Sequence, residues 1–288
     1  SPFKIGVVAK SFPPGLRMAD LGTGSDGTLI VTRTMVLSEI SRQYVDVIVK
    51  QGGTLTCQRW GGDMQPGSSS IRGGKLELRC RGRVVVERGG VIDVSGCGYQ
   101  GGVLIGASLS QVADQFTSSE SYGQQGESLV GVGRGWRDAN AGGGGGGATN
   151  PLFGSVGGGG GGYGSAGEDG TVLHSNGTEY DGGRGGQITG SSRLDPPLLG
   201  NGGGSGAGLS GAGVSRPGRG GAGGGILVIV CRDLVVHAGG AIRADGENGE
   251  RGTSPMDSGG GGGSGGSILI CAGEMHASTG SVVSARGG

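Results

Sequence analysis

A short unit occurs three times in this 288-residue chain and limits the possible folds more than any other feature. The copies cover Gly73–Gly96, Gly224–Gly246 and Gly265–Gly287. Each begins with a glycine pair, continues with an alternating strand that ends in cysteine, and closes with two further short strands separated by glycine. A partial copy lies upstream in YVDVIVKQGGTLTC, with its first strand expected at Leu29–Val31 and an insert before Val47. One such unit cannot bury its apolar face alone, so the copies must stack.

Alternation within the copies assigns their side chains to an inner and an outer face. The expected inner positions are Leu76, Leu78, Cys80, Val84, Val86, Ile92 and Val94, then Leu227, Ile229, Cys231, Leu234, Val236, Ile242 and Ala244, then Leu269, Cys271, Met275, Ala277, Val283 and Ala285. Charged residues such as Glu77 and Arg243 fall on the outer face. A coil of three short strands around an apolar interior is a rung of a parallel β-helix. The expected fold class is therefore all-β, a parallel β-helix or solenoid.

Glycine, at 77 residues, divides the chain into four parts. We expect an N-terminal segment or cap at 1–26, the first rungs at 27–97, a glycine-rich insertion at 98–222 and the last rungs at 223–288. Composition of this kind ordinarily indicates disorder. The apolar residues are nevertheless gathered in short Val/Ile/Leu runs, which favours a narrow packed core with large attachments.

Uninterrupted glycine tracts occur at Gly142–Gly147, Gly157–Gly162 and Gly259–Gly263. They fit either flexible linkers or polyglycine II strands, which have three residues per turn and expose their backbone groups sideways. Only bundled tracts satisfy those groups. Several tracts of similar length favour an ordered bundle. The side chains expected to anchor it to the rungs are Leu152, Phe153, Tyr163, Leu198 and Leu199.

The five cysteines are an odd number, so at least one is free or pairs outside this chain. Stacking of the rungs predicts a ladder of Cys80, Cys231 and Cys271 as small buried hydrophobic side chains. Cys57 and Cys97 end third strands in neighbouring rungs, where either a disulfide or two separate thiols fit.

The stretches GGAGGGILVIVCRDLVVHAGGAIRADGENG and GGGGGSGGSILICAGEMHASTGSVVSARGG resemble glycine-rich parallel β-helix modules of large secreted and cell-surface, adhesin-like proteins. The tracts ANAGGGGGGATN and SVGGGGGGYGSAG are similar to those of the glycine-rich domain of the anaplastic lymphoma kinase receptor family and of phage tail-fibre tip adhesins. The resemblance implies surface structure or adhesion, at an extracellular or cell-surface location. It supplies no catalytic residue.

Charge and motifs argue against several classes of function. Lys+Arg and Asp+Glu are 23 each, so no electrostatic field favours nucleic acid or anionic lipid. The longest apolar run, Ile226–Cys231, has the length of a strand and predicts no membrane insertion. The GxGxxG in Leu21–Gly27 is followed by a strand, which is the wrong context for a nucleotide site. We expect no cofactor and no metal.

Three functions come into consideration, of which we expect the first, and we expect the chain not to be an enzyme. The first is a structural protein of an extracellular filament, coat or matrix, with copies self-associating through the solenoid ends. The second is an adhesin that binds glycans or cell-surface receptors. Its possible ligand-stacking aromatics are Tyr99, Tyr122, Trp136, Tyr163 and Tyr180. The third is a polysaccharide-active enzyme, for which the candidate carboxylates are Asp93 and Asp245, at corresponding edges of the aligned third strands. Asn176 begins the single N-glycosylation motif.

Overall fold

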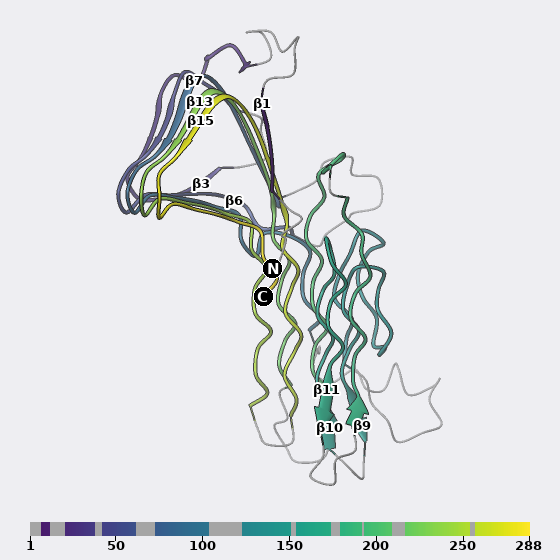
Figure 1. The fold of residues 1–288 in the computed structure, drawn as a ribbon. Coiled ribbons are helices and arrows are strands. Elements are labelled where there is room, and N and C mark those ends of the chain that lie inside the picture. The colour runs from purple at the N-terminus through teal and green to yellow at the C-terminus, as the bar shows by residue number, and fades with distance from the viewer. Residues whose placement is uncertain are drawn as a thin grey trace.

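A computed structural model of the chain describes residues 7–11, 21–37, 42–61, 73–103, 123–150, 154–173, 179–191, 193–208, 217–253 and 257–288. Within these ranges the protein is all-β, with no α-helix. Figure 1 shows strands stacked in a triangular unit, beside which the glycine-rich segments run as long extended legs.

Two parallel sheets, of seven and five strands, contain the repeat copies. The larger sheet has, in spatial order, β1 (Val7–Ser11), β15 (Ser267–Ala277), β13 (Ile226–Val236), β7 (Lys75–Val86), β5 (Val47–Val49) and β2 (Leu29–Val31), with β4 (Arg42–Tyr44) also paired to β7. The smaller sheet has β16 (Val282–Ser284), β14 (Ala241–Arg243), β8 (Val91–Asp93), β6 (Thr54–Cys57) and β3 (Thr34–Leu37). The glycine-rich part adds two antiparallel pairs, β9 (Ala148–Asn150) with β10 (Gly154–Val156) and β11 (Thr171–Leu173) with β12 (Glu179–Asp181). The expectation of an all-β fold with parallel sheets is confirmed.

Each full repeat copy contributes one layer to both sheets. Its first two expected strands are the two halves of one long strand, namely β7, β13 or β15, and the third strand is β8, β14 or β16. The layers are in register, since Ile229 lies opposite both Leu78 and Ile270. The register between β7 and β13 shifts after Cys231, where β7 contains one additional residue.

The core lies inside the triangle and consists of the inner positions of the stacked layers. Leu78, Ile229 and Ile270 form one of its ladders and have almost no exposed surface. The fully buried inner side chains include Val31, Val47, Val49, Leu55, Val84, Val86, Ile92, Val94, Leu227, Leu234, Val236 and Ile242. Full burial of one such side chain contributes about 1.5–3 kcal/mol. The layers are therefore held together mainly by apolar side chains that only stacking can bury.

The cysteine ladder has two members, not three. Cys80 and Cys231 lie directly opposite each other and are fully buried. In β15, Ala272 is opposite Cys231, whereas Cys271 is opposite Val230. The expectation that Cys271 joins the ladder and faces the core is therefore wrong.

In the first strand of the third copy, the residues that face the core are shifted by one position from those expected. The shift was missed because this strand is apolar on both faces. Ile268 and Ile270 take the inner positions that were expected for Leu269 and Cys271. Leu269 instead packs on the outer face, in a small second cluster that contains Leu21. Alternation cannot fix the phase of a strand whose two faces are both covered.

The upstream part of the chain forms two layers rather than one partial copy. Val47 lies opposite Val84, as expected, and Leu55 lies opposite Ile92. Leu29 is opposite Val47, so β2 is not the first strand of that layer but belongs to a further layer with β3. The first strand of the inner layer is β4, which pairs with β7.

The N-terminal strand β1 lies at the opposite end of the stack from β2. It pairs in parallel with the first half of β15, from Val7 opposite Ile268 to Ser11 opposite Ala272. The chain then reaches β2 at the other end, and Leu21 packs on the outer face of β13 and β15. Strand β1 thus lies along the outer edge of the first half of β15.

The described glycine-rich tracts are joined by backbone hydrogen bonds between different legs. The N–H of Gly159 donates to the carbonyl of Gly145 at 2.9 Å, and the N–H of Gly204 donates to Gly159 at 2.9 Å. Gly261 continues the series by donating to Gly204 at 2.9 Å, and Gly221 donates to Gly261 at the same distance. The legs therefore form one cross-bonded bundle.

Candidate binding surface

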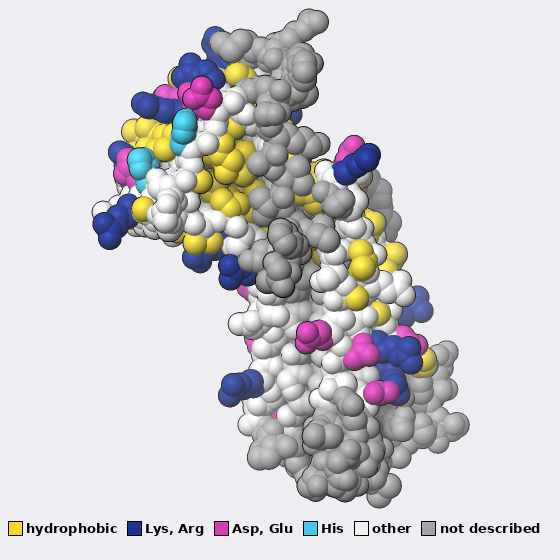
Figure 2. All heavy atoms as spheres, in the orientation of Figure 1, with side chains coloured by type: hydrophobic (Ala, Val, Ile, Leu, Met, Phe, Trp, Pro, Cys, Tyr) yellow, Lys and Arg dark blue, Asp and Glu magenta, His cyan; other side chains and the backbone are white. Residues whose placement is uncertain are grey.

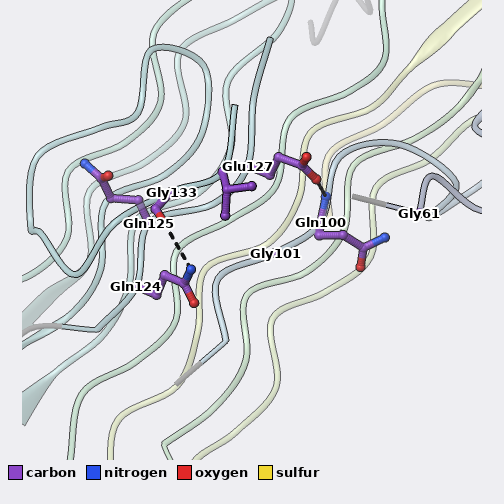
Figure 3. A pocket seen from close by; sticks show the side chains of 8 residues that line it. Gly61, Gln100, Gly101, Gln124, Gln125, Glu127 and Gly133 are labelled. Carbon is purple, nitrogen blue, oxygen red and sulfur yellow. Dashed lines mark hydrogen bonds between the residues drawn. The ribbon is translucent and has the colours of Figure 1, made fainter. Parts of the chain in front are cut away.

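A cavity of about 240 Å³ lies between the segment that follows β8 and a hairpin of the glycine-rich part (Figure 3). It is lined by Gly61, Gln100, Gly101, Gln124, Gln125, Glu127, Val132 and Gly133. Its side-chain walls are thus three amides, one carboxylate and one valine. No ligand motif in the sequence indicated this site.

Glu127 joins three segments that are distant in the sequence. Its carboxylate is buried, with 5% of the residue exposed. The Trp60 indole N–H donates to Oε1 at 3.0 Å, and the Gln100 backbone N–H donates to Oε2 at 3.0 Å. The Trp60 ring meets Tyr99 edge-on, with centroids 5.5 Å apart. Burial, and secondarily the charge of Glu127, raise the pKa of Tyr99.

The two neighbouring glutamines are fixed by hydrogen bonds to the backbone. Gln124 Nε2 donates to the Gly133 carbonyl at 3.0 Å, the bond drawn in Figure 3. Gln125 Nε2 donates to the Asp138 carbonyl at 2.7 Å, and its Oε1 accepts from the Arg134 N–H at 2.9 Å. The wall of the cavity is therefore preformed. Each amide oxygen has a second lone pair, which suits a ligand that presents hydroxyl groups.

An exposed apolar tip lies on the same hairpin. Leu129, Val130 and Val132 are 60%, 69% and 64% exposed, and Trp136 is 42% exposed. Ser128 and Gly131 bridge the turn that presents these side chains. Figure 2 shows a group of hydrophobic side chains on the glycine-rich part, separate from those on the triangular unit. Exposed apolar groups of this kind mark interaction sites.

Replacing Glu127 by alanine tests whether this carboxylate holds the hairpin to the stack. The variant leaves the buried Trp60 donor unpaired, at about 1–3 kcal/mol, whereas the Gln100 N–H lies at an exposed residue where water can replace the carboxylate. We expect Glu127→Ala to lower the free energy of unfolding by at least ~1 kcal/mol, measured by urea denaturation. Glu168→Ala, at an exposed position of the same glycine-rich part, is the control. Equal stability of the two variants would contradict the assignment.

Tyr163 is a packing anchor rather than a ligand-stacking aromatic. It is 3% exposed, and its hydroxyl lies 2.6 Å from Ser267 Oγ, at the start of β15. Leu199 is buried nearby, while Leu198 donates its N–H to Ser267 Oγ at 3.1 Å. These three residues thus connect the bundle to the stack as predicted. Leu152 and Phe153 lie outside the described residues.

The other predicted aromatics have different outcomes. Tyr99 is half-buried against Trp60, which leaves its ring poorly placed to stack on a ligand. Trp136 remains accessible, with its indole N–H donating to Asp138 Oδ2 at 2.8 Å. Tyr122, the Tyr180 side chain and the glycosylation candidate Asn176 lie outside the described part of the structure.

Cys57 and Cys97 lie close together as free thiols, so the disulfide alternative is not formed here. The Cys97 Sγ–H donates to the Cys57 carbonyl at 3.8 Å. The thiol–thiol hydrogen bond first, and burial second, raise the pKa of Cys57, and the same bond lowers the pKa of Cys97.

Thiol labelling of the folded protein distinguishes Cys271 from the other four cysteines. Cys271 is half-buried, whereas the others are buried. Burial also raises the pKa of Cys231 to about 12 and that of Cys80 further, which suppresses the reactive thiolate. We expect Ellman's reagent to titrate one thiol per native chain and five after unfolding in guanidinium. Cys271→Ser should abolish the native reaction. Rapid labelling of a second thiol would contradict the buried positions.

The carboxylates considered for catalysis stabilise the turns of stacked layers. Asp93 Oδ1 accepts from the Ser95 N–H at 2.9 Å. In the next layer Asp245 accepts from the Ser284 hydroxyl at 2.8 Å and from the Arg286 N–H at 2.7 Å. These carboxylates thus bond within and between layers. Among the described residues, no group of three or more histidines, cysteines or acidic residues could hold a metal ion.

Comparison of the chain with protein-family models, with curated proteins and with solved structures finds no match. The described ranges contain no helix of the length and apolarity that membrane crossing requires. Sequence reasoning missed Trp60 and the amide-rich run Gly123–Glu127. The signal available in the sequence was the presence of three amide or carboxylate side chains among these five consecutive residues of a glycine-rich segment.

Proposed function

We propose that this chain is a parallel β-helix with an attached bundle of polyglycine II helices, and that it is a structural component of an extracellular filament, coat or matrix. The observation that carries the proposal is the stacking of the layers. They pair in parallel, and the outermost strands β2, β3 and β16 have no partner on their outer edge among the described residues. Such edges accept further strands readily.

The glycine-rich bundle supports the same proposal. Its legs bond to one another through the backbone, as polyglycine II helices do because they expose N–H and C=O groups sideways. A bundle without bulky side chains is suited to a mechanical role more than to chemistry. The resemblance to secreted β-helix modules supports the extracellular location.

Electron microscopy and sedimentation velocity across a dilution series test the proposed function. Filaments or a series of oligomers with a regular repeat, dissociating on dilution, are the expected result. A chain that remains monomeric at all concentrations would overturn it.

A binding module is the second candidate, favoured by the apolar hairpin tip beside the polar cavity. The Glu127 and glutamine oxygens could accept hydrogen bonds from sugar hydroxyls. Leu129 and Val130 could contact an apolar surface of the same ligand. A glycan array is the direct test. Binding that is lost in Leu129→Asp/Val130→Asp but kept in Ile188→Asp, an equally exposed position elsewhere, would support this function.

A further inference from the structure

The two ends of the stack leave complementary strand positions open. At one end the outermost layer consists of β2 and β3, which occupy the second and third strand positions. At the first position, Asp26 and Gly27 form hydrogen bonds with β4 and the residue that follows it. At the other end β1 covers only the first half of β15, as far as Ala272. Within the described residues, the second half of β15 and all of β16 carry no strand on their outer side.

We propose that these ends join head to tail, with β2 and β3 of one copy adding in parallel to β15 and β16 of a second copy. The inference rests on the proposed structural function and specifies its interface. It commits to a second copy of this chain as the partner.

The pairing within the chain defines the register of this junction. Leu29 is opposite Val47, and Val47 is opposite Val84. Val84 is also aligned with Leu234, which is opposite Met275. Continuing this ladder into a second copy places Leu29 over Met275. The same reasoning in the smaller sheet places Met35 over Val283, through Leu55, Ile92 and Ile242.

The side chains that meet in this register are apolar and incompletely covered. Met275 is 41% exposed, although it occupies an inner position of its layer. Leu29, Met35 and Val283 are likewise only partly buried against the core. Head-to-tail contact removes their apolar surface from water, which favours association. It also pairs the edge N–H and C=O groups, which a partner without a strand does not.

A second copy fits this surface because its β2 and β3 continue the same parallel ladders that β5 and β6 form within the chain. The contact is heterologous, since one end differs from the other. Repetition of a heterologous contact gives an open-ended assembly unless the rotation closes a ring.

Cross-linking between two different cysteine variants tests the register. Ile30 is 53% exposed, and His276 is exposed on the same outer ladder at the other end. Adjacent strands are about 4.8 Å apart, so Ile30→Cys in one chain and His276→Cys in another lie within reach of a short bismaleimide. Both variants carry Cys271→Ser, which removes the accessible native thiol. Ile188→Cys, 62% exposed in the glycine-rich part, replaces Ile30→Cys in the control mixture.

The expected result is a covalent dimer from the Ile30→Cys and His276→Cys mixture and none from the control mixture. Oligomers seen by sedimentation without this cross-link would overturn the junction and leave the structural function standing. Absence of any oligomer would overturn both.

Discussion

Gly159→Ala should destabilise the glycine-rich bundle strongly, whereas Gly160→Ala, one residue further on, should be nearly neutral. A methyl group at Gly159 would lie 2.2 Å from the backbone oxygen of Arg184, so the backbone must move. At Gly160 the nearest atom would be 3.4 Å away. Overpacking costs about 1–3 kcal/mol even where side chains give way. We expect at least ~3 kcal/mol for Gly159→Ala.

Differential scanning calorimetry and hydrogen exchange of the tract amides measure this difference. In Gly159→Ala, the amides of Gly145 and Gly204, which flank Gly159 in the bundle, should lose protection. Gly157→Ala is a second control, because its nearest atom would lie at 3.2 Å. If all three variants behave alike, the tract is not packed between its neighbours.

The contrast within this tract identifies why glycine is needed there. No glycine of Gly157–Gly162 has a positive φ, so the requirement is space and not backbone freedom. A methyl group would collide with backbone atoms at Gly158 and Gly161, whereas the space beside Gly157 and Gly160 is larger. The open positions are three residues apart, which is the period of a polyglycine II helix. This period supports the proposed geometry of the bundle.

Sequence alternation predicted the stack where a strand has one polar face. In β7, Glu77 and Arg79 mark the outer face, so the inner positions were assigned correctly. In SILICA of β15, both faces are apolar, and anchoring the alignment on Cys271 gave the wrong phase. The physical cause is the cover that Leu21 provides on the outside. A contact from a segment so distant in the sequence leaves no local signal.

The short upstream strands show a second limit of sequence reasoning. The triplets Leu29–Val31 and Val47–Val49 have the same apolar pattern, so either fits several positions in a layer. Only the pairing of β2 with β5 separates them into two layers. The cavity was missed for a similar reason, since the bond of Trp60 to Glu127 spans 67 residues without periodicity.

Ile229→Ala should cause the largest loss of stability among the core variants of the stack. Ile229 is fully buried between Leu78 in one layer and Ile270 in the next. Truncation to alanine leaves a cavity bounded on both sides, and such changes cost about 2–5 kcal/mol. Val85→Ala, at a half-buried position of the outer face, should cost less, about 1 kcal/mol. Guanidinium denaturation measures both, and similar midpoints would contradict the assignment of faces.

Met35→Ala tests whether the cost of truncating a core side chain depends on the position of its layer in the stack. Met35 is in the end layer, with the core on one side only, through Leu55. In the monomer its truncation should therefore cost less than that of Ile229, about 1 kcal/mol, because the site is partly open and can collapse. Head-to-tail association would cover Met35 from the other side. The stability that Met35→Ala loses relative to wild type should then grow as protein concentration rises, because assembly stabilises the wild-type chain by mass action. The gap between the losses caused by Met35→Ala and Ile229→Ala should therefore narrow. A difference that is independent of concentration would mean that the β2–β3 end remains uncovered.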